Sequence, residues 1–287
     1  MAPPSEQSPP PPPRSPVVRA LTAPLEFLGR RTLAMLDQVG ASLFLMVTTI
    51  SWSWRAAWDK RVRLGRPAII TQMVRIGVRS VFIVSLVSGC VGLILAFQLS
   101  PPLDQFGQKE LVANIIAIAV LRELGPLIGA IVLTGFAGAS IAAEIGTMVV
   151  SEEVEALEAH ALDPVRFLVV PRVFASVFSM TVLAVLADVV AVIAALGIAV
   201  TALEIPYTTF VNNMLDQAKL VDFLTGVSKG TVFGLLIGLI ACVNGLRVTG
   251  GAAGVGRATT GTVVQCIVAI VIADLAFTAV FYAFRLF

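Results

Sequence analysis

Charged residues are scarce in this chain. Lysine, arginine, aspartate and glutamate make up 13% of its 287 residues, about half the share of a typical soluble domain, while 57% of the residues are hydrophobic. A soluble protein of this composition would expose more apolar surface than monomers tolerate, whereas a lipid bilayer accommodates it. The composition therefore argues against a water-soluble protein and predicts an all-α integral membrane protein.

The sequence also lacks the signatures of common enzymes. There is no GxxxxGK[ST] phosphate loop and no HExxH motif, and His160 is the only histidine. Cys90, Cys242 and Cys266 lie in apolar segments without the spacing of a zinc site. The glycine-rich run 250–256 superficially resembles a dinucleotide loop, but it follows an apolar segment of membrane type and no βαβ unit surrounds it. We therefore expect no catalytic residue, metal or cofactor on this chain.

Basic residues are concentrated near the N-terminus. Ten of the twenty lysines and arginines fall within the first 75 positions, against four acidic residues there. Basic residues beside a first membrane span stay on the cytoplasmic side, so this bias predicts a cytoplasmic N-terminus and does not indicate nucleic-acid binding. Residues 1–16 are rich in proline and serine and have no cleavable apolar run, which is typical of a disordered tail and not of a secretory signal.

Residues 17–70 mix apolar residues with arginines. The uncharged stretch 38–54 ends with Trp52 and Trp54, and tryptophans beside arginines suit the headgroup layer better than the acyl core. This region is interpreted as an interfacial, amphipathic helix region. The alternative, a short first span, would invert the topology of everything that follows.

About five later segments are long and apolar enough to cross a bilayer, since ~20 residues at ~1.5 Å rise cover the hydrocarbon core. Pro101–Pro102 is expected to end the first span, and Asp163 and Pro164 resemble the N-cap and first position of the helix that forms the third. A glycine-rich link at 247–261 is expected to separate the last two. With a cytoplasmic N-terminus, five spans place the C-terminus on the periplasmic side. The predicted spans are 80–100, 111–150, 172–203, 223–246 and 262–286.

The second segment, 111–150, is twice the length that one span requires. It could form two spans with a tight turn at Gly125–Pro126, or one long helix bent by the proline. We favour one pass, because a turn containing only Arg122 and Glu123 as polar residues would make a poor surface loop.

Several ionisable residues fall inside predicted spans. Glu123 would lie roughly 16 Å deep, beyond the reach of a short carboxylate to the surface, so it should line a polar cavity or pair with Lys229 or Arg122. Lys229 is a functional candidate by its position, and snorkelling to the surface is an equally weighted alternative. For Asp188 and Asp274 we expect structural hydrogen bonding.

The fourth span carries four glycines at intervals of four residues. Such a row forms a groove along one helix face, and small residues in lipid allow a neighbouring helix to approach closely. We expect these glycines to serve helix packing, with direct substrate contact as the alternative. They are Gly226, Gly230, Gly234 and Gly238.

The only strongly acidic run lies at 151–163 and contains no lysine or arginine. Ser151 is a suitable helix N-cap, and acids in a first turn suit the helix dipole. Val154, Leu157 and Ala161 recur at helical spacing, which predicts a short amphipathic helix with one apolar stripe. The acids of this run are Glu152, Glu153, Glu155, Glu158 and Asp163.

Three stretches resemble the motifs of MlaE-type (YrbE) permeases. They are VLRELGPLIGAIVLTGFAGASIAAEIGTM at 120–148, EALEAHALDPVRFLVVPRV at 155–173 and GGAAGVGRATTGTVV at 250–264. The resemblance covers roughly residues 70–285, and we place the permease domain at 71–287. It implies the homodimeric permease of an ABC transporter in the bacterial inner membrane, which moves phospholipid between that membrane and a periplasmic MCE-domain carrier and maintains outer-membrane lipid asymmetry. ATP would be bound by a separate ATPase subunit, and a STAS-domain protein would be a further partner.

The resemblance also implies roles for particular residues. The acidic run 151–163 would be the coupling helix that inserts into the ATPase. Our leading hypothesis lines a lipid cavity with Phe97, Gln98, Glu123 and Lys229, although Gln98 is followed here by Leu-Ser-Pro-Pro and not by the family's glycine-aromatic turn. Two other classes remain open: an ion-coupled secondary transporter that uses Glu123 and Lys229, and a membrane scaffold without transport activity.

Overall fold

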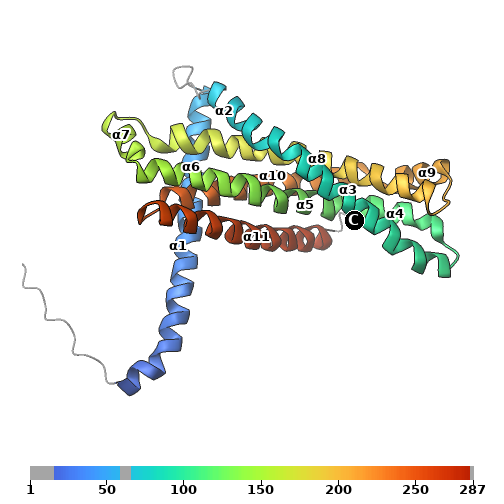
Figure 1. The fold of residues 1–287 in the computed structure, drawn as a ribbon, viewed down its shortest axis with the longest axis horizontal. Helices are drawn as coiled ribbons and strands as arrows, with labels where there is room; N and C mark the ends of the chain where they lie inside the picture. The colour runs from blue at the N-terminus through green and yellow to red at the C-terminus, as the bar shows by residue number, and fades with distance from the viewer. Residues whose placement is uncertain (1–15, 59–65, 285–287) are drawn as a thin grey trace, which may run out of the picture. The chain divides into compact units, whose positions relative to one another are not determined.

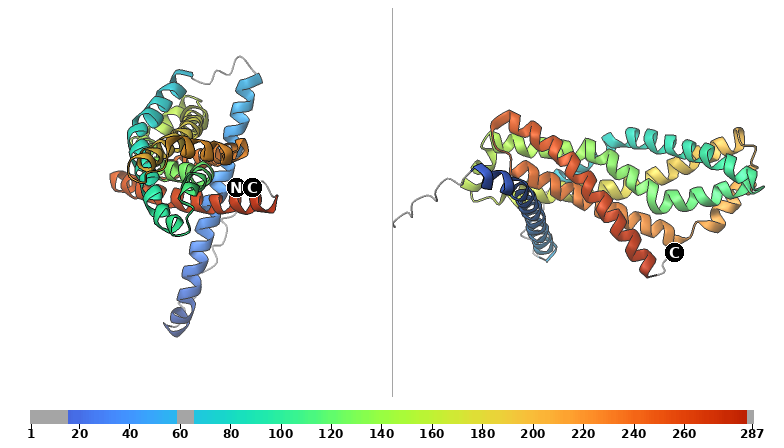
Figure 2. Two further views of the ribbon diagram at one scale, coloured as in Figure 1. Left: turned by 90° about the vertical axis from the view of Figure 1, so that its right-hand side faces the viewer. Right: turned by 90° about the horizontal axis from the view of Figure 1, so that it is seen from below.

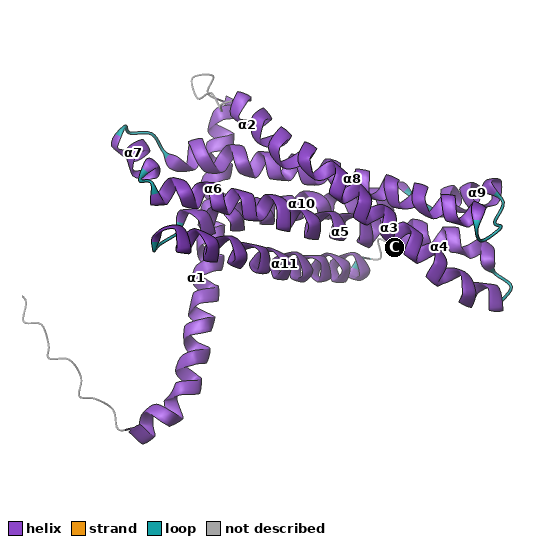
Figure 3. Cartoon of the chain, in the orientation of Figure 1, coloured by secondary structure: helices purple, strands orange, loops and turns teal. Residues whose placement is uncertain are grey.

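The computed structural model describes residues 16–58 and 66–284. All regular elements in these two ranges are helices, with no strand among them (Figure 3). The predicted proline-rich tail lies outside the described residues, apart from Pro16, where α1 (Pro16–Trp58) begins. The chain divides into two compact units, residues 1–44 and 45–287, and the first is described only as the N-terminal part of α1.

Five helical segments of the second unit are long and apolar enough to cross a membrane, which confirms the predicted number (Figure 1). Among the described residues α1 is not one of them, in agreement with its assignment outside the spans. The segments are Pro67–Gln105, Lys109–Val150, Val165–Thr201, Leu220–Leu246 and Gly251–Ala283.

The first three spans are built from several helical elements each. The first comprises α2 (Arg66–Met73), η1 (Val74–Val78) and α3 (Arg79–Gln105), so it begins well before the predicted position 80. The second comprises η2 (Lys109–Leu111), α4 (Val112–Ala119), η3 (Val120–Leu124), α5 (Gly125–Leu133), η4 (Thr134–Gly138) and α6 (Ala139–Val150). The third comprises η5 (Val165–Val169) and α8 (Val170–Thr201). The remaining spans are α10 (Leu220–Leu246) and α11 (Gly251–Ala283).

The second span confirms the single-pass prediction, because its helical path is unbroken from Lys109 to Val150. Where a tight turn was the alternative, the chain forms the wide π-helical turn η3. The N–H of Gly125 donates to the carbonyl of Val120, five residues back. A π-helical turn widens the helix locally and absorbs Pro126 without ending the helix.

Two expected helix boundaries were wrong. Pro101 and Pro102 lie inside α3, which continues to Gln105. The fixed φ of proline is compatible with a helix, and its main cost is that the carbonyls one turn earlier lose their N–H donor. The expected link 247–261 is reduced to four residues, since α11 begins at Gly251. Glycine-rich sequence is a poor helix former in isolation, but packing in the bundle overrides this preference.

The spans pack around α8 and α10. Helix α8 contacts α3, α5 and α10, and α10 also contacts α6 and α11. In the most apolar stretch of α10, 67% of residues are buried, against 11% in that of α11. Figure 2 shows why: α11 diverges from the other spans toward its C-terminal end. The outer helix therefore presents a long apolar surface to its surroundings.

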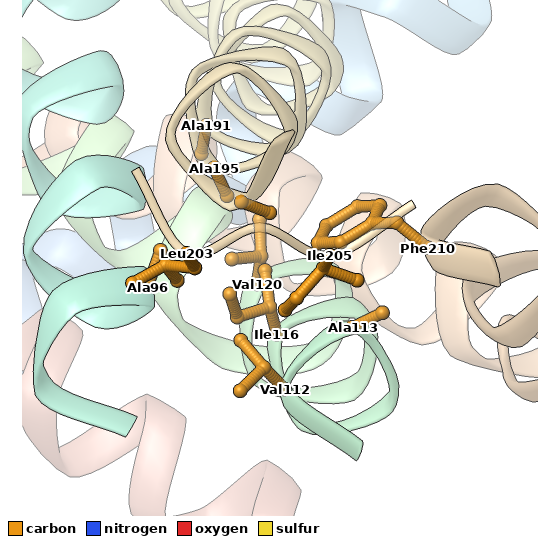
Figure 4. Packing of buried hydrophobic residues seen from close by; sticks show 11 residues of the cluster. Ala96, Val112, Ala113, Ile116, Val120, Ala191, Ala195, Leu203, Ile205 and Phe210 are labelled. Atoms are coloured by element: carbon orange, nitrogen blue, oxygen red, sulfur yellow. The ribbon is translucent and has the colours of Figure 1, made fainter. Parts of the chain in front are cut away.

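The two ends of the bundle differ. Helix α7 (Glu153–Ala159) follows α6 at one end, and α9 (Tyr207–Gln217) follows α8 at the other (Figure 1). Sequence reasoning missed α9, which is too short and polar to carry a membrane signal. Its Phe210 is buried against Ile116 and Ile205 in the apolar cluster that closes this end (Figure 4).

The glycines of α10 lie where neighbouring backbone comes close. A Cβ at Gly234 would stand 2.7 Å from the carbonyl oxygen of Ser176 and 2.9 Å from Cα of Val177, both on α8. At Gly226 it would overlap the carbonyl oxygen of Leu121 on η3. Only hydrogen fits at these positions, so α10 can lie directly against two other spans.

We predict that Gly234→Ala destabilises the protein by about 1–3 kcal/mol, because the added methyl group meets backbone that cannot move aside. Gly197→Ala in α8 is the matched control, since no atom lies within 4 Å of the position of its Cβ. SDS-induced unfolding, followed by tryptophan fluorescence, measures both. Equal stability of the two variants would show that the contact at Gly234 does not limit packing.

Candidate functional site

Lys229 is the most buried charged side chain of the spans, with 1% of its surface exposed. It lies nine residues after the start of α10, or about 14 Å along the axis at the usual helical rise. The helix begins three residues earlier than the sequence predicted, which places the lysine deeper. The alternative of snorkelling is wrong, because the ammonium group bonds inward to other spans.

The ammonium of Lys229 donates three hydrogen bonds. Its Nζ lies 2.6 Å from Oε2 of Glu123, 2.8 Å from Oδ1 of Asp274 and 3.1 Å from Oγ1 of Thr278. The hydroxyl of Thr278 in turn donates to Oε1 of Glu123 at 3.0 Å. A lysine has three donors, so this cluster satisfies all of them. We call these four residues the Lys229 cluster; it joins η3, α10 and α11.

The π-helical turn η3 positions the acidic member of this cluster. Pro126 lacks the N–H that the carbonyl of Leu121 would accept if the five-residue pattern continued. Gly226 of α10 packs directly on that carbonyl oxygen, where its Cα can approach as a weak donor. The approach of α10 at this point brings Lys229, three residues further on, within reach of Glu123.

A second ion pair lies beside the cluster. Arg122 bonds through its guanidinium to Oδ1 of Asp222, whose side chain is 2% exposed. The other oxygen of Asp222 accepts the N–H of Lys219 at 3.0 Å and so caps α10. Arg122 therefore pairs with Asp222, and Lys229 is the partner of Glu123. Sequence reasoning missed Asp222, because an acid in a first helical turn is common.

The cluster carries more negative than positive charge, with two carboxylates against one ammonium. Lys229 is enclosed, but the side chain of Glu123 is 34% exposed and that of Asp274 is 16% exposed. The two carboxylates thus reach the surface of the bundle, and the enclosed ammonium of Lys229 partly neutralises their negative charge. Such an edge can accept hydrogen bonds from hydroxyl or amine groups of a ligand, or bind a proton.

The other two residues assigned to the cavity lie on α3. Phe97 is 51% exposed and Gln98 is also exposed, near the two prolines of this helix. In the part of the chain that the structure describes, no hydrogen bond or ion pair joins either residue to the Lys229 cluster. The structure thus brings together Glu123 and Lys229, and the place of Phe97 and Gln98 in a cavity stays a prediction.

The expectation of structural hydrogen bonding held for Asp274 but was wrong for Asp188. Asp188 is 2% exposed in α8, and neither carboxylate oxygen has a hydrogen-bond partner among the described residues. The carboxylate lies against Gly125, where a Cβ would overlap it. Close packing fills the space beside Asp188 with glycine backbone, so no polar side chain reaches the carboxylate.

The acidic run forms a shorter helix than predicted. Ser151 ends α6, where its hydroxyl bonds the carbonyl of Thr147 at 3.0 Å, and does not cap α7. Ala161 lies beyond α7 in a left-handed turn with φ 57°, so the apolar stripe consists of Val154 and Leu157 alone. Both are half-buried, while the acids Glu152, Glu153, Glu155 and Glu158 are exposed.

Asp163, four residues after the end of α7, connects the start of the third span to α1. Its Oδ1 accepts the N–H of Val165 at 2.8 Å, as an N-cap side chain does, and its Oδ2 accepts Nε1–H of Trp52 at 2.9 Å. The guanidinium groups of Arg55 and Arg166 each lie 5.5 Å from the centre of the Trp52 ring. These contacts tie the C-terminal part of α1 to the segment that follows α7.

A helical bundle with five segments long and apolar enough to cross a membrane, an ionic cluster inside them and an exposed acidic helix at one end defines a multi-pass membrane protein. The family model Permease MlaE matches residues 69–280. A probable ABC transporter permease protein of Rickettsia felis is 33% identical over 256 residues, which cover 89% of this chain and 96% of that protein. The chain therefore belongs to the MlaE permease family, as the sequence motifs indicated.

Two further relatives are similar. A probable ABC transporter permease protein of Rickettsia prowazekii is 35% identical over 214 residues, 75% of this chain and 83% of the relative. The Arabidopsis thaliana protein TRIGALACTOSYLDIACYLGLYCEROL 1, chloroplastic, is 34% identical over 219 residues, 74% of this chain and 61% of that protein.

We predict that Lys229→Met lowers the free energy of unfolding by about 3–5 kcal/mol, because it leaves the partly buried carboxylates of Glu123 and Asp274 without a cation. Lys219→Met, at the exposed start of the same helix, is the control and should be nearly neutral. SDS-induced unfolding measures both. A Lys229→Met protein as stable as the control would contradict the compensation described for the cluster.

Proposed function

We propose that this chain is the membrane-spanning subunit of an ATP-driven phospholipid transporter, and that the Lys229 cluster borders the path of the lipid. The observation that carries the proposal is the partial exposure of Glu123 and Asp274 around an enclosed lysine. Charges at this depth are costly in hydrocarbon, so exposed carboxylates there indicate a polar cavity. A polar cavity within apolar walls suits an amphiphile.

The comparisons support a lipid as the cargo. One relative bears the name TRIGALACTOSYLDIACYLGLYCEROL 1, which contains the name of a glycolipid, and the others are named as probable ABC transporter permeases. The hydroxyl-rich or amine-bearing head of a lipid can donate hydrogen bonds to the two carboxylates. Phe97 and Gln98 would contribute to the same cavity from α3, where both are exposed.

A homodimer would complete such a cavity. The most apolar part of α11 is only 11% buried, and this helix contributes Asp274 and Thr278 to the cluster. A second copy packed near α11 would shield the carboxylate edge from acyl chains while leaving room for a lipid.

Energy would come from a separate ATPase that docks on α7. This helix exposes three acids, with Glu152 just before it, and half-buries the stripe of Val154 and Leu157, at the end of the bundle opposite α9 (Figure 1). An acidic helix at a span junction offers both charge and a short apolar stripe to a partner. ATP would bind to the ATPase and not to this chain, and a STAS-domain protein would be an accessory of that subunit.

The membrane setting follows from the same orientation. The α7 end would be cytoplasmic in the bacterial inner membrane, with the N-terminus on that side and the C-terminus in the periplasm. The α9 end would then meet a periplasmic MCE-domain carrier, and the complex would serve outer-membrane lipid asymmetry.

The experiment is a flux assay on the chain co-purified with its ATPase and reconstituted in liposomes. Transfer of a fluorescent phospholipid should require ATP, and Glu123→Gln should reduce it by about tenfold or more, because a neutral amide cannot replace the charge opposite Lys229. Leu157→Asp should lose the ATPase during purification. Val150→Asp, on the exposed side of α6 before α7, is its control and should keep the ATPase.

Each alternative has its own outcome. Flux driven by a proton gradient without ATP would identify an ion-coupled secondary transporter that uses Glu123 and Lys229. Unchanged flux in Glu123→Gln would remove the cluster from the lipid path, and absence of any flux with an assembled complex would favour a scaffold.

A further inference from the structure

Two adjoining hollows lie near the α7 end of the bundle, away from the Lys229 cluster. Glu144 lines both, and it lies 21 residues after Glu123 on the same span, or about 30 Å along the axis. The larger hollow has a volume of about 610 Å³ and the smaller one about 200 Å³. They share Arg75, Ser140 and Glu144, so we treat them as one site and call it the arginine hollow.

Three arginines from two spans converge on the arginine hollow. Arg75 lies on η1 and Arg79 begins α3, four residues later and therefore on the same helix face, while Arg172 comes from α8. Two acids oppose them. Glu144 stands between the arginines, and Glu153 lies at the α7 edge of the larger part.

Glu144 does not exhaust the donors of these arginines. Its Oε2 accepts from Arg75 at 2.8 Å and its Oε1 pairs with Arg172 at 2.9 Å, so one carboxylate serves two guanidinium groups. Each guanidinium has five N–H donors. Glu144 thus fixes the arginines in place and leaves N–H groups available to a further acceptor.

The spare donors belong to Arg75 and Arg79, whose guanidinium groups are exposed at the hollow. Arg172 is 5% exposed, and its Nε is buried without a hydrogen-bond partner among the described residues, so a ligand in the hollow does not reach this atom. Arg79 makes no hydrogen bond or ion pair within the part of the chain that the structure describes. Gln72 and Ser140 add neutral polar groups to the lining of the smaller part. An exposed arginine without an acceptor beside a hollow can bind an anion there.

The lining changes from polar to apolar along the membrane normal. Phe136 precedes Ser140 by four residues, so it lies one helical turn farther from α7, and it is 45% exposed. Ile76 and Ile141 are buried residues of the same lining. A ligand that matches this lining has an anionic group at the α7 end and apolar chains toward the middle of the bilayer.

We propose that the arginine hollow binds the phosphate of an anionic membrane lipid, on the α7 side of the membrane. Guanidinium groups bind phosphate through paired N–H donors, which makes this the acceptor that best fits Arg75 and Arg79, with the positive charge of Arg172 behind them. The acyl chains run over Phe136. The site is separate from the proposed lipid path, and it requires only that the helices span a membrane.

The test is native mass spectrometry of the full chain in detergent, titrated with phosphatidylglycerol, phosphatidylcholine or inorganic phosphate. The wild-type chain should bind one phosphatidylglycerol at least about tenfold more tightly than phosphatidylcholine, because the choline cation beside the phosphate of phosphatidylcholine would be repelled by the three arginines. Arg79→Gln should abolish this preference. Arg79 is exposed and has no partner to lose, so the variant should fold normally.

Two variants separate the effect of the hollow from that of general charge. Ser140→Leu fills the hollow without changing charge and should also abolish the preference. Arg257→Gln removes one positive charge near the same end, outside the hollow, and should retain it. Glu123→Gln should retain it too, so failure of the proposed transport path would leave this result unchanged.

The remaining outcomes overturn the proposal. Equal binding of the two lipids, or an unchanged preference in Arg79→Gln and Ser140→Leu, would exclude a site for an anionic lipid here. Displacement of phosphatidylglycerol by inorganic phosphate at equal concentration would assign the hollow to the free ion and not to a lipid.

Discussion

The need to neutralise the charge of the buried Lys229 determines how α11 and the second span are arranged around α10. An ammonium in hydrocarbon is tolerated only if its donors are satisfied, and Lys229 meets this demand by drawing on two other spans at once. Glu123 comes from the second span, and Asp274 and Thr278 come from the last. Because α11 buries so little apolar surface of its own, these polar contacts specify where it lies against α10.

The backbone irregularities of the bundle serve the same arrangement. In a regular α-helix through 109–150 the ring of Pro126 would clash with the carbonyl of Arg122, and the π-helical turn η3, which carries Glu123, accommodates the proline. The carbonyl that loses its donor at this turn is covered by Gly226, so local strain and helix contact coincide. The small-residue face of α10 and the ionic cluster therefore depend on each other.

The sequence was informative where burial alone decides the outcome. Membrane class and five spans follow from the length and apolarity of segments, and one pass through 111–150 was favoured because a turn with only Arg122 and Glu123 as polar residues would make a poor surface loop. Depth in the membrane indicated Lys229 or Arg122 as the partner of Glu123, and the structure shows Lys229. Arg122 and Asp222 were not recognised as a pair, because their contact depends on the earlier start of α10 and on the wider turn at η3. The hydrophobic periodicity of the sequence indicates neither the earlier start of α10 nor the π-helical turn.

Errors occurred where packing overrides local preference. Pro101 and Pro102 do not stop α3, glycines after 250 do not prevent α11, and Ser151 terminates a helix where it was expected to begin one. Asp188 is the clearest case. A buried carboxylate is expected to have a hydrogen-bond partner, but the space beside Asp188 is occupied by the backbone of Gly125. Which neighbour fills a site is a tertiary property.

A double-mutant cycle tests the central claim most directly. Lys229→Met, Asp274→Asn and their combination would be compared by SDS-induced unfolding. We expect a coupling energy of about 1–3 kcal/mol, with the double variant more stable than the two single losses added together would allow. A coupling energy near zero would show that α11 is not held to α10 by this ion pair, and would contradict the account.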